Sequence, residues 1–489
     1  MKPFRSVKFG LFSLPLICLL TALAVSAPTP AGAMEEGESP AGVPLGESEG
    51  AAIGAEEGGR ELPPMVAPPP FARYKHAQPD ILLKDKKEGR YIVPIPIVGY
   101  DPDTGINVGA GVSFFQNGYK ESPFFRYAPY RQMLMAQFIA TTQKVFQFTA
   151  LYDQPYIFDT PFRVRGELEL YRNPMDNYFG IGSQGNLLTF PGSPTVYGSY
   201  RDYKNALDRV VNGRTYSHYD EYKYSKVAVR GAAEYDLLGG LFRPLVGFQV
   251  AHVWIGDYSG QVSNGVLQQP THLKDDCDSG RAIGCSGGND IYLKFGLTFD
   301  TRDFEPDPKK GIVASVMTEF SPKFLGSAFN YGRMTASMMG YGEILKYKTQ
   351  QLVITGRFAY NWQFGDIPFY SMGIFTFEDQ DDRALGGIEN LRGYAVNRFI
   401  GPVGMVANAE LRHTFVQFDV FKQNIKLQLV PFLDYGRVFD SNSAVTMKDW
   451  KLGGGVGLHL AWNLATIISF DYAWSGEDQA FYMDVGHQF

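Results

Sequence analysis

The chain has 489 residues, 20% of them charged, and a formal net charge of −6. This mild acidity, without any basic block, argues against nucleic acid as a partner. Apart from the first 30 residues, no apolar run approaches the ~20 residues that a membrane-spanning helix needs. The chain is therefore either a soluble β-rich protein or a membrane β-barrel.

The first 33 residues have the features of a secretory signal peptide. Basic residues precede the apolar run 11–25, and small residues follow it, with cleavage sites that end at Ala27 and at Ala33. The sequence leaves the choice between these two sites open. An uncleaved membrane anchor is the alternative, and Pro15 disfavours it because it interrupts the apolar run.

Residues 34–90 are expected to form a disordered periplasmic tail and a lead-in to the folded part. The segment 34–62 holds eight glutamates against one arginine, and the following LPPMVAPPPF is rich in proline. Such segments offer too few apolar side chains to build a packed core. We therefore expect a flexible tail, and a soluble periplasmic partner docked on 34–75 stays open as one role.

Alternation of apolar and polar side chains begins at residue 91 and recurs to the end of the chain. Successive side chains of a strand point to opposite faces, so this pattern gives each strand one polar and one apolar face. Each run is near the ~9–11 residues with which a tilted strand crosses a bilayer. The expected strands lie near 91–100, 106–115, 133–142, 144–153, 162–172, 221–236, 244–258, 290–302, 311–321, 328–341, 350–362, 403–415, 424–438, 450–461, 464–475 and 480–489.

Long polar connections alternate with short turns along these runs. The long ones lie near 172–220, 259–289, 363–402 and 437–449. Outer-membrane barrels alternate extracellular loops and periplasmic turns in this way. The predicted fold class is therefore all-β, a transmembrane antiparallel β-barrel of about sixteen strands over 91–489, with both termini in the periplasm.

A glycine-rich loop with one arginine precedes two of these runs. It contains Leu391, Arg392, Gly393 and Tyr394 in succession. A guanidinium is a rigid fork that suits a carboxylate. If the loop folds back into the lumen, Arg392 can reach Asp434, on the polar face of the second run. The alternative is an exposed loop arginine without a fixed partner.

The acceptor strands show which faces carry charge. In the first run Glu410 shares a face with Asn408 and Arg412, while the alternate positions are apolar. In the second run Asp434 lies opposite Leu433 and Tyr435. Glu410 is therefore expected near Arg392 and Asp434 on the lumen side.

These stretches resemble the barrel of the bacterial surface antigen family, which includes BamA and TamA. The resemblance rests on the Leu-Arg-Gly-Tyr loop, the Asn-Ala-Glu-Leu-Arg strand at 408–412 and Phe-Leu-Asp-Tyr-Gly at 432–436. A further match is the turn motif with Asp300, Arg302, Asp303 and Gly311. The similarity covers roughly residues 90–489.

The resemblance implies that Arg392 pairs with Asp434 and pins the loop inside the barrel. It also implies a role in inserting or translocating proteins or lipids at the bacterial outer membrane. The implied partners are outer-membrane lipids and unfolded outer-membrane proteins. The family normally carries POTRA modules before its barrel, and the segment 34–90 has no room for one. A passive pore or a structural surface protein is therefore the alternative function.

The expected last strand, 480–489, places alternate residues from Phe481 to Phe489 on one face. An aromatic last residue resembles the C-terminal signal of outer-membrane proteins. Closure of the barrel requires this strand to pair with 91–100, where Pro94 and Pro96 each lack a backbone donor. Either these prolines leave the seam under-paired, or the first strand begins after them.

Two cysteines, Cys277 and Cys285, lie close together in a polar connection. Exported chains meet oxidising conditions, so a local disulfide is expected. In the chain-entropy model it stabilises the fold by about 2–3 kcal/mol.

The sequence contains no coherent catalytic constellation, and we predict no enzyme activity, cofactor or metal. The string at 284–288 fits G-x-S-x-G but lies in a polar loop, and 180–185 fits G-x-G-x-x-G without a following helix. The histidines show no metal-ligand spacing. A weak calcium site at the paired aspartates of the loops, such as Asp275 with Asp276, is the alternative.

Overall fold

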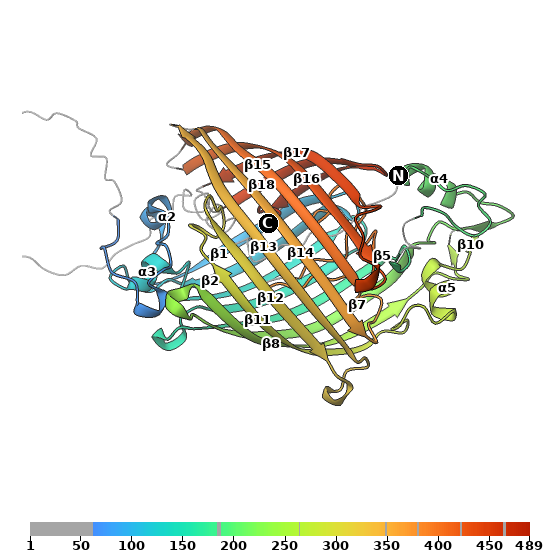
Figure 1. Cartoon of the computed structure of the whole chain (residues 1–489), viewed down its shortest axis with the longest axis horizontal. Helices are drawn as coiled ribbons and strands as arrows, with labels where there is room; N and C mark the ends of the chain where they lie inside the picture. The colour runs from blue at the N-terminus through green and yellow to red at the C-terminus, as the bar shows by residue number, and fades with distance from the viewer. Residues whose placement is uncertain are drawn as a thin grey trace, which may run out of the picture.

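A computed structural model describes residues 62–489, except 183–186, 264, 348–349, 379–380, 421–422 and 463–465. The expected signal peptide and the acidic part of the expected tail lie outside the described residues. The described part forms a closed barrel in which each strand is antiparallel to its neighbours (Figure 1). The prediction of about sixteen strands is confirmed.

The barrel strands follow one another in chain order around the wall, with the last returning to the first. They are β1 (Arg90–Asp101), β2 (Gly105–Gln116), β3 (Gln132–Thr141), β4 (Phe146–Gln154), β5 (Phe162–Asn177), β7 (Glu221–Tyr235), β8 (Phe242–Gly256), β11 (Gly288–Asp300), β12 (Gly311–Ser321), β13 (Tyr331–Tyr347), β14 (Gln350–Gly365), β15 (Val403–Val420), β16 (Gln423–Phe439), β17 (Lys451–Trp462), β18 (Thr466–Ser475) and β19 (Gln479–Val485).

The two faces of the wall differ as the alternation predicts. In β14, Ile354 and Phe358 are 51% and 47% exposed on the outside, whereas Thr355 and Arg357 between them are buried in the lumen. An apolar exterior with a polar interior is the pattern of a barrel that meets lipid outside. No helix in the described part of the chain is long and apolar enough to cross a membrane.

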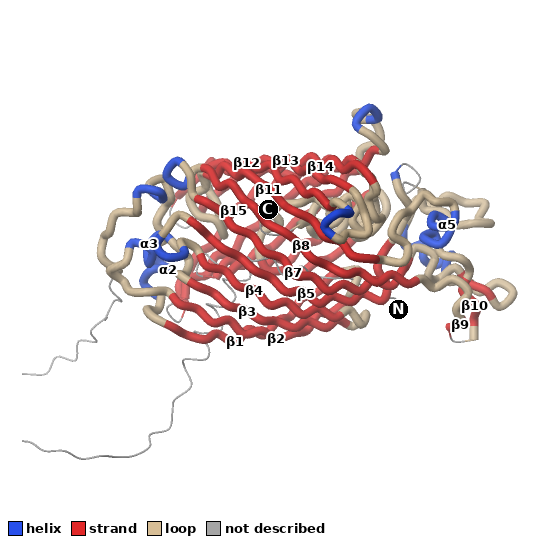
Figure 2. The backbone as a smooth tube through the Cα atoms, turned by 90° about the horizontal axis from the view of Figure 1, so that it is seen from below, coloured by secondary structure: helices blue, strands red, loops and turns tan. Residues whose placement is uncertain are grey.

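The two ends of the barrel carry different structures (Figure 2). One end, here called the terminal end, carries residues 62–89 and the connections that follow the even-placed strands of the wall, such as that between β11 and β12. The other, the loop end, carries the long connections and a three-stranded sheet. The minor elements are η2 (Pro70–Ala72), α2 (Asp80–Asp85), α3 (Pro123–Tyr127), η3 (Ile157–Asp159), β6 (Arg214–Thr215), α4 (Tyr200–Leu207), η5 (Leu238–Gly240), β9 (Val262–Ser263), β10 (Val266–Gln268), α5 (His272–Asp278), η6 (Lys323–Leu325) and η7 (Asn442–Ala444).

Residues 62–89 pack against the terminal end, which corrects the expectation that the flexible tail extends to residue 75. Ala72 and Leu83 are buried. The Lys86 ammonium donates to the carbonyl oxygens of Phe125 and Ala128, at 2.7 and 2.6 Å. The few apolar side chains of this segment suffice because they enter a surface that the barrel turns already form, so no separate core is needed.

The seam between β1 and β19 is the weakest junction of the wall. The strands share one aligned pair among the described residues, Tyr100 with Met483, whereas β1 and β2 are aligned from end to end. β1 begins at Arg90, so the alternative that the first strand starts after Pro96 is wrong.

The ladder also shows where the prolines of β1 point. Asn117 of the β2 side donates its backbone N–H to the Gly89 carbonyl, so odd-numbered residues here direct their backbone groups toward β2. Alternate residues of an antiparallel strand face opposite neighbours. Pro94 and Pro96 are even-numbered, so the backbone nitrogens that lack a hydrogen face the seam.

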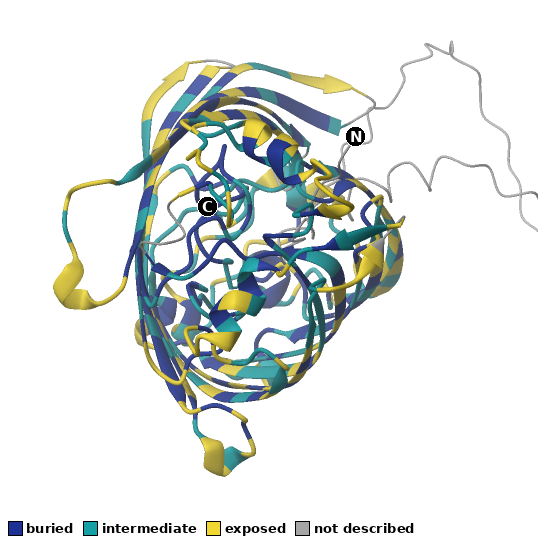
Figure 3. Cartoon of the chain, turned by 90° about the vertical axis from the view of Figure 1, so that its right-hand side faces the viewer, coloured by how far each residue is buried: buried dark blue, intermediate teal, exposed yellow. Residues whose placement is uncertain are grey.

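The last strand ends earlier than expected. β19 stops at Val485, Gly486 has a φ of +119°, and the last residues turn into the lumen. Figure 1 and Figure 3 both place the C-terminus within the barrel. The expectation that His487 and Phe489 share a strand face with Phe481 is wrong, because glycine permits this backbone conformation and the lumen offers charged partners.

Candidate functional site

The candidate site is built around the inner loop, residues 366–402, which connects β14 to β15 and enters the lumen. Its apolar residues form a cluster with the inner wall. The loop therefore has a core of its own inside the barrel. The buried members are Phe375, Leu385, Leu391, Tyr394 and Phe399 of the loop, with Ala359, Val406 and Val438 of the wall.

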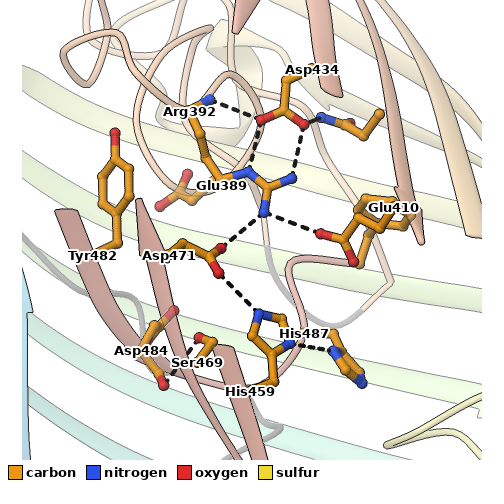
Figure 4. A network of polar contacts seen from close by, with 12 residues as sticks. Glu389, Arg392, Glu410, Asp434, His459, Ser469, Asp471, Tyr482, Asp484 and His487 are labelled. Atoms are coloured by element: carbon orange, nitrogen blue, oxygen red, sulfur yellow. Dashed lines mark hydrogen bonds and ion pairs between the residues drawn. The ribbon is translucent and has the colours of Figure 1, made fainter. Parts of the chain in front are cut away.

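Arg392 is fully buried at the tip of this arrangement (Figure 4). Its Nε and Nη2 donate to the two carboxylate oxygens of Asp434 in β16, at 2.8 and 3.0 Å. Its backbone N–H donates to the same carboxylate at 3.1 Å. The structure thus places the arginine and aspartate of the sequence motif in a bidentate ion pair, the strongest geometry for this pairing.

Three carboxylates surround the Arg392 guanidinium. Besides Asp434, its Nη1 donates to Glu410 at 3.1 Å and to Asp471 at 2.9 Å. Arg412 donates to the other oxygen of Glu410 at 3.0 Å. Buried carboxylates are costly unless paired, so this mixed cluster holds the loop against β15, β16 and β18 at once.

Sequence reasoning missed two contacts of Arg392. Asp471 lies on the polar face of a strand that the alternation had identified, so its parity was a usable signal. The Phe432 ring lies 3.3 Å from the guanidinium carbon, measured to its centroid. Phe432 precedes Asp434 by two residues, on the same strand face, and a cation over an aromatic ring adds stability in a desolvated site.

A second arginine fixes the base of the same loop. Arg357 of β14 donates to the Asp382 carboxylate at 3.0 Å and to the Glu389 carbonyl at 2.8 Å. It also donates to Asn408 at 2.9 Å. The inner loop is therefore held by an arginine of the wall as well as by Arg392.

The loop lies directly on the wall at two glycines. A Cβ at Gly453 of β17 would lie 2.1 Å from the Arg392 carbonyl oxygen. Gly393 has a φ of +89°, and a Cβ there would lie 2.9 Å from the Trp474 carbonyl carbon. At Gly393 only glycine combines this close approach with a left-handed backbone, and at Gly453 a side chain would collide with the loop backbone.

The C-terminal segment 486–489 is joined to this network. The Phe489 carbonyl oxygen accepts from Arg412 at 2.7 Å. His487 lies 3.2 Å from His459, which in turn contacts Asp471 at 2.9 Å (Figure 4). The loop arginine and the end of the chain are thus connected through β17 and β18.

The turn motif lies at the terminal end, after β11. Arg302 donates to both oxygens of the Asp300 carboxylate. Asp303 accepts backbone N–H groups of 309 and 310, at 2.9 and 3.2 Å. Gly311 has a φ of +111°, and a Cβ there would lie 2.4 Å from the Thr301 carbonyl oxygen. The four residues shape one turn and lie apart from the Arg392 cluster.

The structure joins Cys277 and Cys285 in a disulfide at the loop end. Neighbouring Asp276 accepts from the Tyr178 hydroxyl at 2.6 Å and pairs with Arg281 at 2.8 Å. The described residues contain no group of three or more potential ligands that could hold a metal ion. Asp276, one of the paired aspartates, thus has protein partners in this structure.

Comparison with known proteins gives a curated relative over part of the chain. The chain is similar to the outer membrane protein assembly factor BamA of Nitratidesulfovibrio vulgaris, with 27% identity over 220 residues. This similarity covers 42% of the chain and 26% of that protein, so it spans about a quarter of the relative's length.

Two solved structures are similar to this chain at low sequence identity. BamA from Haemophilus ducreyi lacking POTRA domains 1–3 matches with a TM-score of 0.49 and 15% identity, over 82% of this chain and 70% of that one. CdiB from Escherichia coli matches with a TM-score of 0.48 and 10% identity, over 82% and 63%.

Two family models match the chain. One, described as a domain of unknown function (DUF5982), matches residues 70–131, and so joins the packed terminal segment to β1 and β2. The other, described as the Omp85 superfamily domain, matches residues 136–489. Because this second match covers well over half of a chain that forms a closed β-barrel, the chain belongs to the Omp85 superfamily of outer-membrane barrels.

Proposed function

We propose that this chain inserts other barrel proteins into the outer membrane by opening its seam toward lipid. The observation that carries the proposal is the contrast between one aligned pair at the seam and full ladders elsewhere. A strand edge with unpaired backbone groups is a template for another strand. An incoming unfolded chain could add its strands to β1 at this edge.

The prolines of β1 support the same role. With their nitrogens facing the seam, Pro94 and Pro96 cannot donate to β19, so complete closure would leave two positions of the ladder without a donor. The early turn at Gly486 removes the end of β19 from the same edge. Both features keep the seam easy to separate without weakening the rest of the wall.

The inner loop supports insertion over a passive pore. Its apolar cluster and the ion pairs of Arg392 occupy the part of the lumen that β14 to β18 line. A channel for solutes needs a continuous passage, whereas a lateral opening toward lipid does not. In this proposal the terminal end faces the periplasm, the source of unfolded barrel proteins, and the loop end faces the outside.

Depletion of the protein in its host tests the proposal. Cells are depleted and complemented with the wild-type chain or with Arg392→Ala, and outer-membrane proteins and lipids are quantified. We expect other barrel proteins to fall upon depletion and to recover with the wild-type chain only. A change in the lipids with unchanged outer-membrane proteins would mean that the chain moves lipids and not barrel proteins. An unchanged membrane would overturn the proposal in favour of a passive pore or a structural surface protein.

A further inference from the structure

The loop end of the seam is bridged by the inner loop. On the β1 side, the Val396 backbone N–H donates to the Asp103 carboxylate in the turn after β1, at 2.7 Å. On the β19 side, Arg398 pairs with both oxygens of Glu477, in the turn before β19, at 2.7 and 3.1 Å. Val396 and Arg398 are two residues apart, so one short piece of chain holds both edges.

The β19 side of this bridge has further contacts. The Gly393 N–H donates to the Tyr482 hydroxyl at 3.2 Å. The Ser475 hydroxyl donates to the Gly393 carbonyl at 2.8 Å. Arg398 is fully buried, and its guanidinium carbon lies 5.1 Å from the centroid of the Phe179 ring. A buried bidentate pair with added backbone contacts resists separation more than a single hydrogen bond does.

The end of β5 and the long connection that follows it also contact the bridge. The side-chain amide of Asn177 donates to the Val396 carbonyl at 3.0 Å, so both backbone groups of Val396 are engaged. The Tyr200 N–H, at the start of α4, donates to the Glu477 carbonyl at 2.8 Å. These contacts fix the bridge in position over the seam.

We propose that Asp103, Val396, Arg398 and Glu477 form a clasp that controls the opening of the seam. β1 and β19 share one aligned pair, so strand pairing alone holds them weakly. Separation at the loop end requires the inner loop to release one edge. Asp103 makes the contact on the β1 side through the Val396 backbone N–H, while the Arg398 contacts keep the loop on β18 and β19. Asp103 and Arg398 are therefore positioning residues for the proposed insertion.

This inference rests on the proposed function, but the clasp is measured on the purified protein without any client. Spin labels at Ile106→Cys in β2 and Trp474→Cys in β18 report the distance across the seam. Both side chains are exposed on the outer wall, and Cys277 and Cys285 are joined. Asp103→Ala removes the acceptor, Asp103→Asn retains an oxygen for the Val396 N–H, and Asp449→Ala is the control at an exposed loop carboxylate.

We expect Asp103→Ala to raise the ratio of open to closed molecules at least about tenfold, the factor for losing a hydrogen bond to a charged group. Asp103→Asn should restore most of the closed population, and Asp449→Ala should match the wild type. Arg398→Ala should open the seam as well. The Asp103 and Arg398 contacts lie in series on one segment of the inner loop, so the loss of either contact releases the seam. The double variant Asp103→Ala with Arg398→Ala should therefore open no further than the more open single variant.

Additive opening in the double variant would mean that the two contacts act independently, and would overturn the clasp. Unchanged distances between the spin labels in Asp103→Ala and in Glu477→Gln would overturn the clasp too. If Asp103→Ala does not fold, the measurement on Glu477→Gln decides alone. An opened seam with normal insertion of client barrels would retain the clasp as a closure device and would instead contradict the proposed function.

Discussion

Three hydrogen bonds join Arg392 of the inner loop to the single carboxylate of Asp434 in β16. Both side chains are fully buried, so neither charge has water as a substitute partner. The position of the loop inside the barrel depends on this pair more than on any exposed contact. Removal of one partner would leave the other charge buried without its main counter-ion.

Arg392→Ala is therefore expected to lower the free energy of unfolding by about 3–5 kcal/mol, the usual cost of breaking a buried pair. Protease should cut the inner loop faster in this variant. A double-mutant cycle with Asp434→Asn should show coupling between the two sites. Arg209→Ala, in an exposed part of the loop end, is the control and should change neither quantity. Strict additivity with unchanged proteolysis would mean that the two side chains do not meet.

The terminal segment offers a second pair, Lys75 with Asp236, at 2.7 Å. Lys75→Met should release residues 62–89 from the barrel and cost about 1.5–3 kcal/mol, as for a hydrogen bond to a charged group. Faster protease cleavage of 62–89 is the measurement, and Lys84→Met, at an exposed position of α2, is the control. Equal cleavage in both variants would argue against this attachment.

The same pair predicts a pH dependence. Burial lowers the pKa of Lys75, but the charges of Tyr156 and Asp236 outweigh burial and raise that pKa above its ordinary value of 10.5. A raised pKa in the folded state means that the contact stabilises the fold below pH 10.5 and that this contribution is lost as the pH rises through the folded-state value. Protection of 62–89 should therefore persist at neutral pH and fall in strong alkali in the wild type, with no such fall in Lys75→Met.

The last residue provides a third prediction. The Phe489 ring lies 5.4 Å from the Arg357 guanidinium and 5.7 Å from that of Arg412. Carboxypeptidase should remove Phe489 slowly from the folded wild type, because the segment lies in the lumen. Phe489→Ala should lose about 0.5–2 kcal/mol of cation–aromatic stabilisation and expose the segment to the enzyme. Rapid digestion of the folded wild type would contradict the lumen position.

The pairing of Cys277 with Cys285 is tested by mass spectrometry of unreduced peptides. We expect a single linked peptide from the loop end of the exported protein. The replacement of both residues by serine should loosen the apolar cluster beneath them, which includes Tyr178 and Phe369. Two free thiols in the exported protein would contradict the pairing.

The strands of the barrel wall could be predicted from the sequence better than the contacts that depend on how the barrel closes. Alternation with a period of two is a local property, so it indicated the number of strands and the inward faces of Glu410 and Asp434. The Asp471 contact was missed because it depends on β18 lying opposite the loop tip, which follows only from the shape of the closed barrel.

The sequence could not predict that the C-terminal residues leave the last strand, because two competing sets of contacts decide their position. In the extended chain, Phe489 continues the outer parity of Phe481. In the structure, contact with Arg412 prevails over pairing with β1. Likewise, 62–89 has the composition of a disordered tail, and its order depends on turns of the barrel, remote in sequence.

A covalent lock across the seam tests the central claim most directly. Cysteines replace the aligned pair Tyr100 and Met483, and a control lock replaces the aligned pair Phe114 and Leu134 of β2 and β3. When the Tyr100–Met483 lock is oxidised, we predict that client insertion is lost and that a reductant restores it. The protein with the control lock should insert clients normally in both states. Normal insertion by the oxidised Tyr100–Met483 lock would contradict the claim that this barrel works by opening its seam.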